Sequence, residues 1–282
     1  MLHSFKEISI KGYEANEDSI GYSSNFIFVI DGASSLQKEK ITTKNSDAEY
    51  FSHHLCNGLM ENLGDTSRDI KTIILSILEN IKKDYDKQKE NSLASTIIPP
   101  SASVSIFRIN QNQLEYFGLG DCTAVIKKNS QEVIVLHDDT VAKLDNIVIQ
   151  QMIKISSEHN ISIREARKWV DELLINNRLK MNTPEGYWTV DLSGVGVMFH
   201  ATTCLFPACD IYNIAVMSDG FADIVNSYGI YGNFEELNNA VETKELNHIV
   251  RSLFDLQDSD YDFSKYPRLK FRDDTSIVWA KF

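Results

Sequence analysis

The spacing of apolar residues constrains the fold of this chain more than any other feature of its sequence. Short apolar runs of strand length come in blocks, and segments with helical spacing separate the blocks. The expected strands cover residues 4–11, 18–23, 25–30, 102–106, 114–117, 123–127, 132–136, 211–217 and 276–279. Because tight turns join neighbouring strands, we expect antiparallel pairing.

Helices are predicted between these blocks. They cover residues 46–63, about 70–81, about 140–177 and 234–254. Ser46 with Glu49, and Ser162 with Glu165, form capping-box patterns that mark two helix starts. Strand blocks that alternate with helix pairs favour an α+β sandwich over a parallel βαβ sheet.

Length and composition fit one globular domain. The chain has 282 residues, of which 43% are apolar, so we expect a single domain over residues 1–282. The helical pattern at about 140–180 predicts an insertion within a run of strands. The 40 acidic residues outnumber the 28 basic ones, and this negative balance opposes binding to nucleic acid or to anionic membranes.

Residues 1–7 show no secretory signal pattern, and no apolar run approaches the roughly 20 residues that cross a bilayer. The four cysteines lack C-x-x-C spacing, so we expect a cytoplasmic protein; its oligomeric state stays open.

Acidic residues stand at the ends of the predicted strands. They are Glu17 and Asp18, Asp31 before Gly32, Asp121 after Gly120, Asp219 before Gly220, and Asp273 with Asp274. Carboxylates gathered in a partly dry pocket repel each other unless a cation neutralises them. Hard oxygen ligands without His or Cys select Mg²⁺ or Mn²⁺. A lone Asp-Gly is usually a turn, so the prediction of a metal site depends on the joint occurrence of these motifs.

The ordered set of motifs resembles the metal-dependent serine/threonine protein phosphatases of type 2C, the PPM family. The stretch Thr183-Pro184-Glu185-Gly186-Tyr187-Trp188 resembles one seen in its bacterial members. The matching motifs are Asn16-Glu17-Asp18, Asp31-Gly32 after an apolar strand, Gly120-Asp121, Ser218-Asp219-Gly220 and Asp273-Asp274. The resemblance spans about residues 8–282. It implies an αββα four-layer sandwich, in which two antiparallel sheets pack face to face between outer helices.

The resemblance also implies a ligand set for two ions of Mn²⁺ or Mg²⁺. Asp31 would bridge both ions, the carbonyl of Gly32 would bind one of them, and Asp219 and Asp273 would bind the other. Asp121 would help to hold a third, weaker ion. These roles make Asp31, Asp219 and Asp273 the catalytic residues, acting through metal-bound water.

Further roles follow from the same resemblance. Glu17 and Asp18 would act through metal-bound water and through hydrogen bonds to the ligands. The insertion would form a flap beside the site and influence substrate choice. Two ions can hold a bridging water and aim it at phosphorus without a covalent phosphoenzyme. The expected substrate is a phosphomonoester, namely phosphoserine or phosphothreonine on a protein.

Three departures from the family pattern concern the substrate. The family places an Arg three positions before the Asn of its first motif, where this chain has Tyr13; Lys11 is the candidate substitute for binding phosphate, as a point charge. Ala33-Ser34-Ser35 follows the Asp-Gly pair, without a His to protonate the leaving oxygen. Ser276 replaces the Thr of the last motif. The predicted ligands are all retained, so we expect an active site with altered or slower substrate handling.

Two other functions compete with this expectation. A pseudophosphatase, which is a binding or regulatory module that keeps the fold without turnover, is the alternative that the missing Arg favours. A hydrolase with an aspartyl nucleophile at Asp31 needs a second Asp two positions later, where this chain has Ala33. That class is therefore unsupported.

Overall fold

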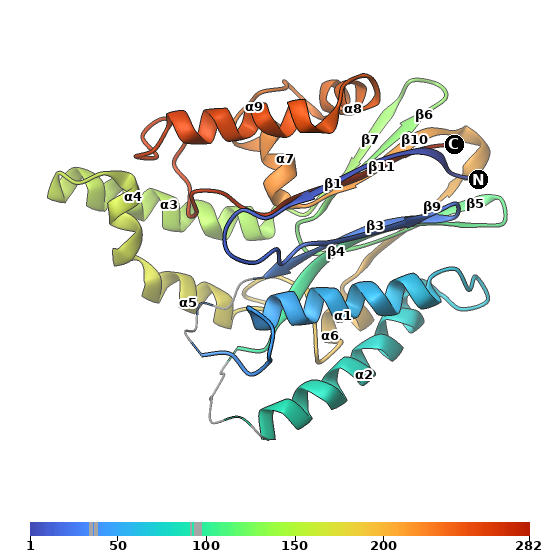
Figure 1. Cartoon of the computed structure of the whole chain (residues 1–282), viewed down its shortest axis with the longest axis horizontal. Helices are drawn as coiled ribbons and strands as arrows, with labels where there is room; N and C mark the ends of the chain where they lie inside the picture. The colour runs from blue at the N-terminus through green and yellow to red at the C-terminus, as the bar shows by residue number, and fades with distance from the viewer. Residues whose placement is uncertain (34–35, 37–38, 91, 93–97) are drawn as a thin grey trace.

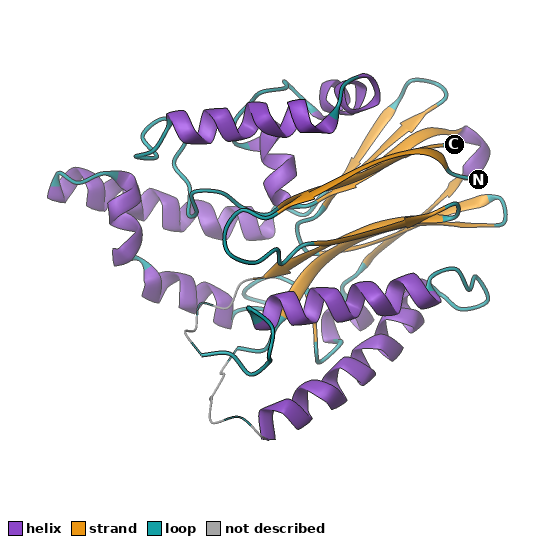
Figure 2. Ribbon diagram, in the orientation of Figure 1, coloured by secondary structure: helices purple, strands orange, loops and turns teal. Residues whose placement is uncertain are grey.

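The computed structural model describes residues 1–33, 36, 39–90, 92 and 98–282. Two antiparallel β-sheets lie face to face and helices cover their outer faces (Figures 1 and 2). This arrangement confirms the predicted α+β fold of αββα type. Positions 34 and 35, which the sequence analysis mentions, lie outside the described residues.

The first sheet has the strand order β1-β11-β10-β6-β7. Its strands are β1 (His3–Ile10), β6 (Thr123–Lys128), β7 (Val133–Leu136), β10 (Ile211–Met217) and β11 (Thr275–Lys281). Every pairing in it is antiparallel. The first and last strands of the chain therefore lie side by side, so residues near the two termini can contribute to one site.

The second sheet has the order β2-β3-β4-β5-β9, and a short strand, β8, also pairs with β4. Its strands are β2 (Ser19–Ser23), β3 (Phe26–Ala33), β4 (Ser101–Asn110), β5 (Gln113–Leu119), β8 (Val190–Asp191) and β9 (Thr202–Pro207). The continuous apolar run in β3 has a simple cause, because this strand is covered on both faces. Ile27 and Val29 pack between the sheets, whereas Phe28 and Ile30 face the helices beyond the second sheet.

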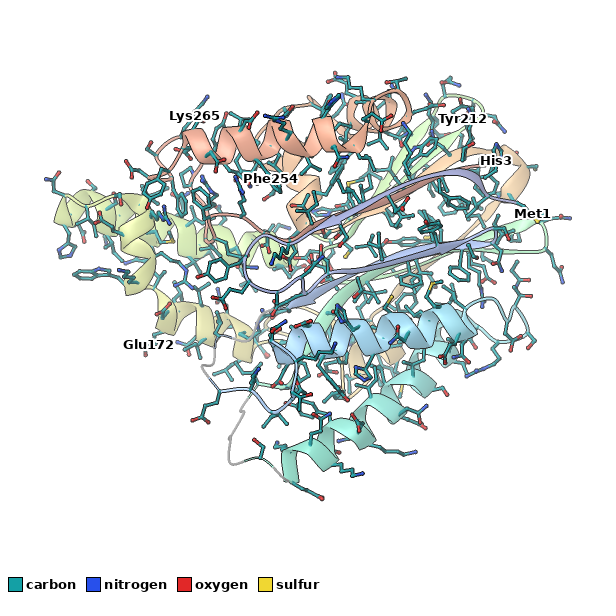
Figure 3. All side chains as sticks on the ribbon, in the orientation of Figure 1. Met1, His3, Glu172, Tyr212, Phe254 and Lys265 are labelled. Atoms are coloured by element: carbon teal, nitrogen blue, oxygen red, sulfur yellow. The ribbon has the colours of Figure 1, made fainter. Side chains whose placement is uncertain are left out.

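Two helical layers enclose the sheets. Helices α1 (Asp47–Asn62), α2 (Ile70–Glu90) and the short α6 (Val195–Phe199) cover the second sheet, and α7 (Asp219–Asn226), α8 (Phe234–Thr243) and α9 (Leu246–Ser259) cover the first (Figure 1). The Ser46 side chain accepts a hydrogen bond from the backbone N–H of Glu49 and begins α1, as predicted. Side chains fill the space between the layers (Figure 3).

Helices α3 (Thr140–His159), α4 (Ile163–Ala166) and α5 (Asp171–Leu179) lie at one end of the sandwich (Figure 1). The predicted capping box of Ser162 and Glu165 begins α4. This helical segment has a small apolar core of its own, which includes Val148, Met152 and Leu174. Its packing therefore depends little on the main sheets.

Two details differ from the predictions. Residues 234–254 form two helices rather than one, because the chain becomes extended at Lys244 and a new helix begins at Leu246. The strand that was expected to end before Asp31 continues to Ala33, since Asp31 and Gly32 still pair with β4. Asp31 is therefore fixed within a sheet rather than in a turn.

Phe28 provides a test of the packing between the second sheet and α1. Its side chain is fully buried, so Phe28→Ala should lower the free energy of unfolding by about 3–5 kcal/mol through lost transfer energy and a cavity. The matched control is Leu205→Ala on β9, where the side chain is 67% exposed and the expected change is within about 0.5 kcal/mol. Urea unfolding of both variants measures the difference. Equal losses would contradict the assigned packing.

Candidate metal centre

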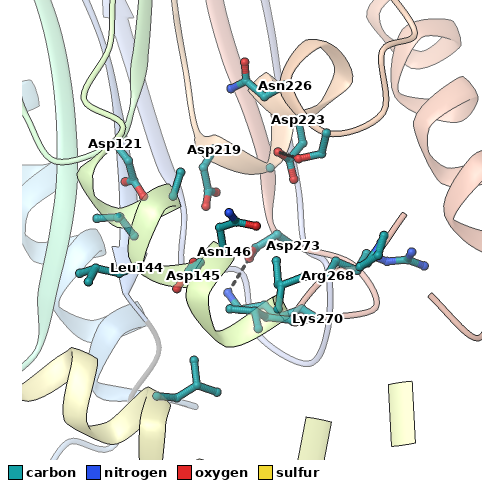
Figure 4. A pocket seen from close by; sticks show the side chains of 18 of the residues that line it. Asp121, Leu144, Asp145, Asn146, Asp219, Asp223, Asn226, Arg268, Lys270 and Asp273 are labelled. Carbon is teal, nitrogen blue, oxygen red and sulfur yellow. Dashed lines mark hydrogen bonds and ion pairs between the residues drawn. The ribbon is translucent and has the colours of Figure 1, made fainter. Parts of the chain in front are cut away.

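A cleft of about 620 Å³ opens at the end of the sandwich beside α3 and α5. Its lining includes Asp31, Gly32, Asp121, Asp219 and Asp273, which come from four separate segments of the chain. Figure 4 shows the carboxylates of Asp121, Asp219 and Asp273 around this space. The structure thus brings together all five residues that the sequence analysis proposed as metal ligands.

The corner between β10 and α7 positions Asp219. Asp219 is the first residue of α7, and its backbone N–H donates to Oδ2 of Asp31 at 3.3 Å. Ser218 and Ser276 exchange hydrogen bonds: the N–H of Ser218 donates to the Ser276 carbonyl, and the N–H of Ser276 donates to Oγ of Ser218, both at 3.0 Å. Ser276, at the position of the family's Thr, therefore joins this corner to β11, which follows Asp273.

Glycines allow the surrounding segments to approach each other closely. A Cβ on Gly32 would lie 2.4 Å from the carbonyl oxygen of Glu17, and a Cβ on Gly220 would lie 2.1 Å from that of Asp274. Neither glycine has a positive φ, so close packing rather than a sharp turn accounts for both. Gly120 differs, because its φ of +89° lies in the region that favours glycine, and it turns the chain into Asp121.

Asp274 fixes the segment that carries the first acidic motif. Its carboxylate accepts hydrogen bonds from the backbone N–H groups of Gly12 at 2.7 Å and Glu17 at 2.6 Å. The Glu17 side chain in turn accepts a hydrogen bond from the Ser46 hydroxyl at the start of α1. Glu17 and Asp18 lie next to the cleft rather than in its lining.

Burial and mutual repulsion raise the pKa values of these acids. Burial raises the pKa of Asp31 well above its ordinary value, and the charges of Asp219 and Asp18 add to this. Burial likewise raises the pKa of Asp219, with Asp273 as the next contributor. The pKa of Asp18 is raised to about 7, first by burial and then by Asp274 and Asp273, against the opposing effect of nearby serine hydroxyls. Ionised carboxylates are therefore unfavourable in this site, and a bound cation would stabilise them.

The donor chemistry fits a hard divalent cation. Every proposed donor is a carboxylate or carbonyl oxygen, the set that Mg²⁺ and Mn²⁺ prefer. Asp18 is only 3% exposed, yet neither carboxylate oxygen has a hydrogen-bond partner. Within the described parts of the chain, no three His, Cys, Asp or Glu side chains are already gathered closely enough to ligate one ion. The acids line one cleft, and joint coordination of an ion requires their side chains to move.

Three residues of the cleft were missed by the sequence analysis. Asp145 on α3 and Asp223 on α7 line it, and burial raises the pKa of each to about 6. The Lys270 ammonium donates to Oδ1 of Asp273 at 2.8 Å (Figure 4). The only sequence signal for Lys270 is its position three residues before Asp273.

The predicted phosphate-binding residue lies elsewhere. Lys11 is exposed, its ammonium donates to the Glu14 carbonyl at 3.4 Å, and it is absent from the cleft lining. Tyr13, at the position of the family's Arg, is 80% exposed. The backbone N–H of Gly12, between them, donates to the Asp274 carboxylate at 2.7 Å. Neither the Lys11 nor the Tyr13 side chain lines the cleft.

The family model for protein phosphatase 2C matches residues 10–255, which include four of the five acidic motifs. The chain belongs to the protein phosphatase 2C family. Members of this family are metal-dependent hydrolases, in agreement with the expectation from the motifs. A comparison with curated protein sequences gives no match.

Solved structures of bacterial phosphatases share the fold. The Mycobacterium tuberculosis serine/threonine phosphatase PstP/Ppp has 16% sequence identity and a TM-score of 0.56, over 100% of this chain and 99% of that chain. The catalytic domain of PstP in complex with two manganese ions has 16% identity and a TM-score of 0.55, over 99% and 98% of the two chains. Stp1 from Staphylococcus aureus has 13% identity and a TM-score of 0.54, over 100% of this chain and 95% of that chain.

Among the described residues of the protein phosphatase 2C chain, no helix is long and apolar enough to span a membrane.

The raised pKa of Asp18 predicts how the stability of the metal-free protein changes with pH. A carboxyl group whose pKa is higher in the folded state contributes stability at low pH, and this contribution is lost as the pH rises through the folded value. In EDTA, the urea midpoint should therefore fall between about pH 4 and pH 7. Asp18→Asn should remove part of this fall. An unchanged pH profile in the variant would show that Asp18 does not contribute.

Proposed function

We propose that this chain hydrolyses phosphomonoesters, and that its substrates are phosphoserine and phosphothreonine residues of proteins. One observation carries the proposal: Asp31, Asp219 and Asp273, from segments far apart in the sequence, line a single cleft in a chain of the protein phosphatase 2C family. The manganese-bound PstP structure supports Mn²⁺ as the first ion to test. Mg²⁺ has the same preference for oxygen ligands.

The proposed ligands are the five residues of the cleft lining. Asp31, the carbonyl of Gly32, Asp219 and Asp273 would hold two ions, and Asp121 would help to hold a third. Bound ions of this kind supply an activated water and neutralise charge on the phosphoryl oxygens. The family's dependence on metal supports this arrangement.

The chain's own residues orient this site. The backbone N–H of Asp219 restrains the Asp31 carboxylate through their hydrogen bond. Asp274 holds the backbone of Glu17 against Gly32, where the absence of a side chain makes room. Asp18, buried and without a hydrogen-bond partner, is available to orient water or a ligand. Such restraints keep reacting groups in place before the substrate binds.

The helices beside the cleft suit a protein substrate. Val141, Leu144 and Ile149 of α3 and Leu174 of α5 contribute apolar surface to the wall of the cleft. This surface can contact the polypeptide on either side of a phosphorylated residue and can exclude water from the acids. We infer that α3–α5 act as the flap that influences substrate choice.

A pseudophosphatase is the second candidate. The missing Arg favours it, because Tyr13 stands at that position and neither Lys11 nor Tyr13 lines the cleft. The retention of every proposed ligand favours hydrolysis. Metal-dependent turnover distinguishes the two.

Aryl phosphate hydrolysis tests the proposed function. The purified protein should be active with Mn²⁺ and inactive in EDTA. Asp31→Asn should lower kcat/KM and Mn²⁺ affinity by at least about 100-fold, since even residues beyond the direct ligands often contribute 10–100-fold. Asp255→Asn, an exposed acid on α9 outside the cleft, is the matched control and should change neither.

Two outcomes would contradict the proposal. Mn²⁺ binding without turnover of aryl phosphate or phosphopeptides would leave the pseudophosphatase as the function. Unchanged Mn²⁺ affinity and activity in Asp31→Asn would show that the acids of the cleft are not the metal ligands.

A further inference from the structure

Besides the proposed metal ions, a basic side chain in the cleft would stabilise a bound phosphate. A phosphomonoester is a dianion near neutral pH, and the cleft presents Asp31, Asp121, Asp145, Asp219 and Asp273 around it. Like charges repel strongly where water is scarce. The segment that carries the family's Arg contributes no cation here, as described above. A basic side chain that contacts the phosphate beside the proposed metal ions must therefore come from another part of the cleft lining.

Two arginines of the lining are already held in the protein structure. The Arg268 guanidinium pairs with Asp260 at 2.7 Å and also donates to backbone carbonyls, including that of Gln257 at 3.1 Å. Arg272 pairs with Asp258 at 2.6 Å, and its guanidinium lies 4.4 Å from the ring centroid of Phe254. Both side chains support the connection between α9 and β11 rather than face an incoming ligand.

The arginines of the flap also have partners within it. Arg167 pairs with Asp171 one helical turn away. Arg178 donates to the hydroxyl of Tyr187 at 3.1 Å. The charge of Arg178 also acts on Asp145 in the cleft lining, where it opposes the rise in pKa that burial causes. Neither of these two contacts joins a guanidinium to a proposed metal ligand.

Lys270 differs from these arginines in its partner. Its ammonium contacts Asp273, one of the proposed metal ligands, and half of its side-chain surface is exposed. The flexible four-carbon stem lets the ammonium move, and its three donors can contact two acceptors at once. An ammonium 2.8 Å from a ligand oxygen is also close to other oxygens of the same coordination sphere. The Lys270 ammonium is thus close enough to contact a phosphoryl oxygen that binds at the proposed metal centre.

We propose that Lys270 is the residue that binds the substrate phosphate in this chain, and that it pairs with Asp273 until a phosphate is present. The proposal rests on the proposed function, because it places the substrate at the metal centre. When Asp273 ligates an ion, its negative charge is shared and it holds the ammonium less strongly. Lys270 can then donate to a phosphoryl oxygen and replace the missing Arg as a point charge.

Lys270→Met and Lys270→Arg test this assignment, with Lys265→Met as the matched control. Lys265 also lines the cleft, but its ammonium lies 5.0 Å from the ring centroid of Tyr266 instead of against an acid. The measurements are the affinity of the Mn²⁺-loaded protein for inorganic phosphate by calorimetry, and the KM and kcat for an aryl phosphate. Mn²⁺ affinity is measured separately for each variant.

Lys270→Met should weaken phosphate binding about 10- to 100-fold, the range for one hydrogen bond to a charged group, and should raise KM similarly with a smaller change in kcat. Lys270→Arg should restore most of the phosphate affinity, because the positive charge returns. Lys265→Met should leave both values unchanged. Mn²⁺ affinity in Lys270→Met should stay the same or increase, since Asp273 loses a competing cation.

The possible failures are distinguishable. Phosphate affinity and KM that do not change in Lys270→Met, or that change equally in Lys265→Met, would overturn the role of Lys270 and leave the proposed function intact. Weaker Mn²⁺ binding in Lys270→Met would also overturn it, because Lys270 would then support the metal ligands. Phosphate binding that depends on Lys270 without turnover would support Lys270 and contradict the proposed hydrolysis. An Mn²⁺-loaded wild-type protein that binds no phosphate would overturn the role of Lys270.

Discussion

Electrostatic repulsion among carboxylates at the end of the sandwich is the constraint on which the rest of the structure depends. Burial and neighbouring charges raise the pKa values of Asp18, Asp31 and Asp219, so the folded chain holds these groups together at a cost to its stability. Such a cost is typical of functional sites rather than of structural ones. A divalent cation relieves it, which connects the stability of the protein to its chemistry.

The two sheets provide the rigidity that this arrangement needs. Asp31 is fixed in β3 of the second sheet, whereas Asp219 and Asp273 adjoin β10 and β11 of the first. Hydrogen bonds from Asp219 to Asp31, and between Ser218 and Ser276, keep these segments in register. The face-to-face packing of the sheets therefore decides the distances between the acids. Helices α3–α5 have an apolar core of their own, and Leu269, next to Lys270, packs against it.

Much of this fold and site could be predicted from the sequence because the signals are local. The apolar strands and the Asp-Gly motifs beside them placed Asp31, Asp121, Asp219 and Asp273 at strand ends, and the structure brings these residues to one cleft. The reason for a glycine at position 32 could not be predicted from the sequence. Close packing against the Glu17 backbone, which is a contact between separate segments, explains this glycine better than a turn does. Lys270 and Asp145 reach the cleft through the tertiary placement of a loop and of a flap helix. The spacing of apolar residues in the sequence does not predict where such a loop or helix lies relative to the cleft.

The most direct test of the central claim is a crystal structure of the protein soaked in Mn²⁺, with the ions located by their anomalous scattering. The account predicts peaks within about 2 Å of oxygens of Asp31, Gly32, Asp219 and Asp273. An absence of peaks from this cleft at saturating Mn²⁺, with the carboxylates directed away from each other, would contradict it.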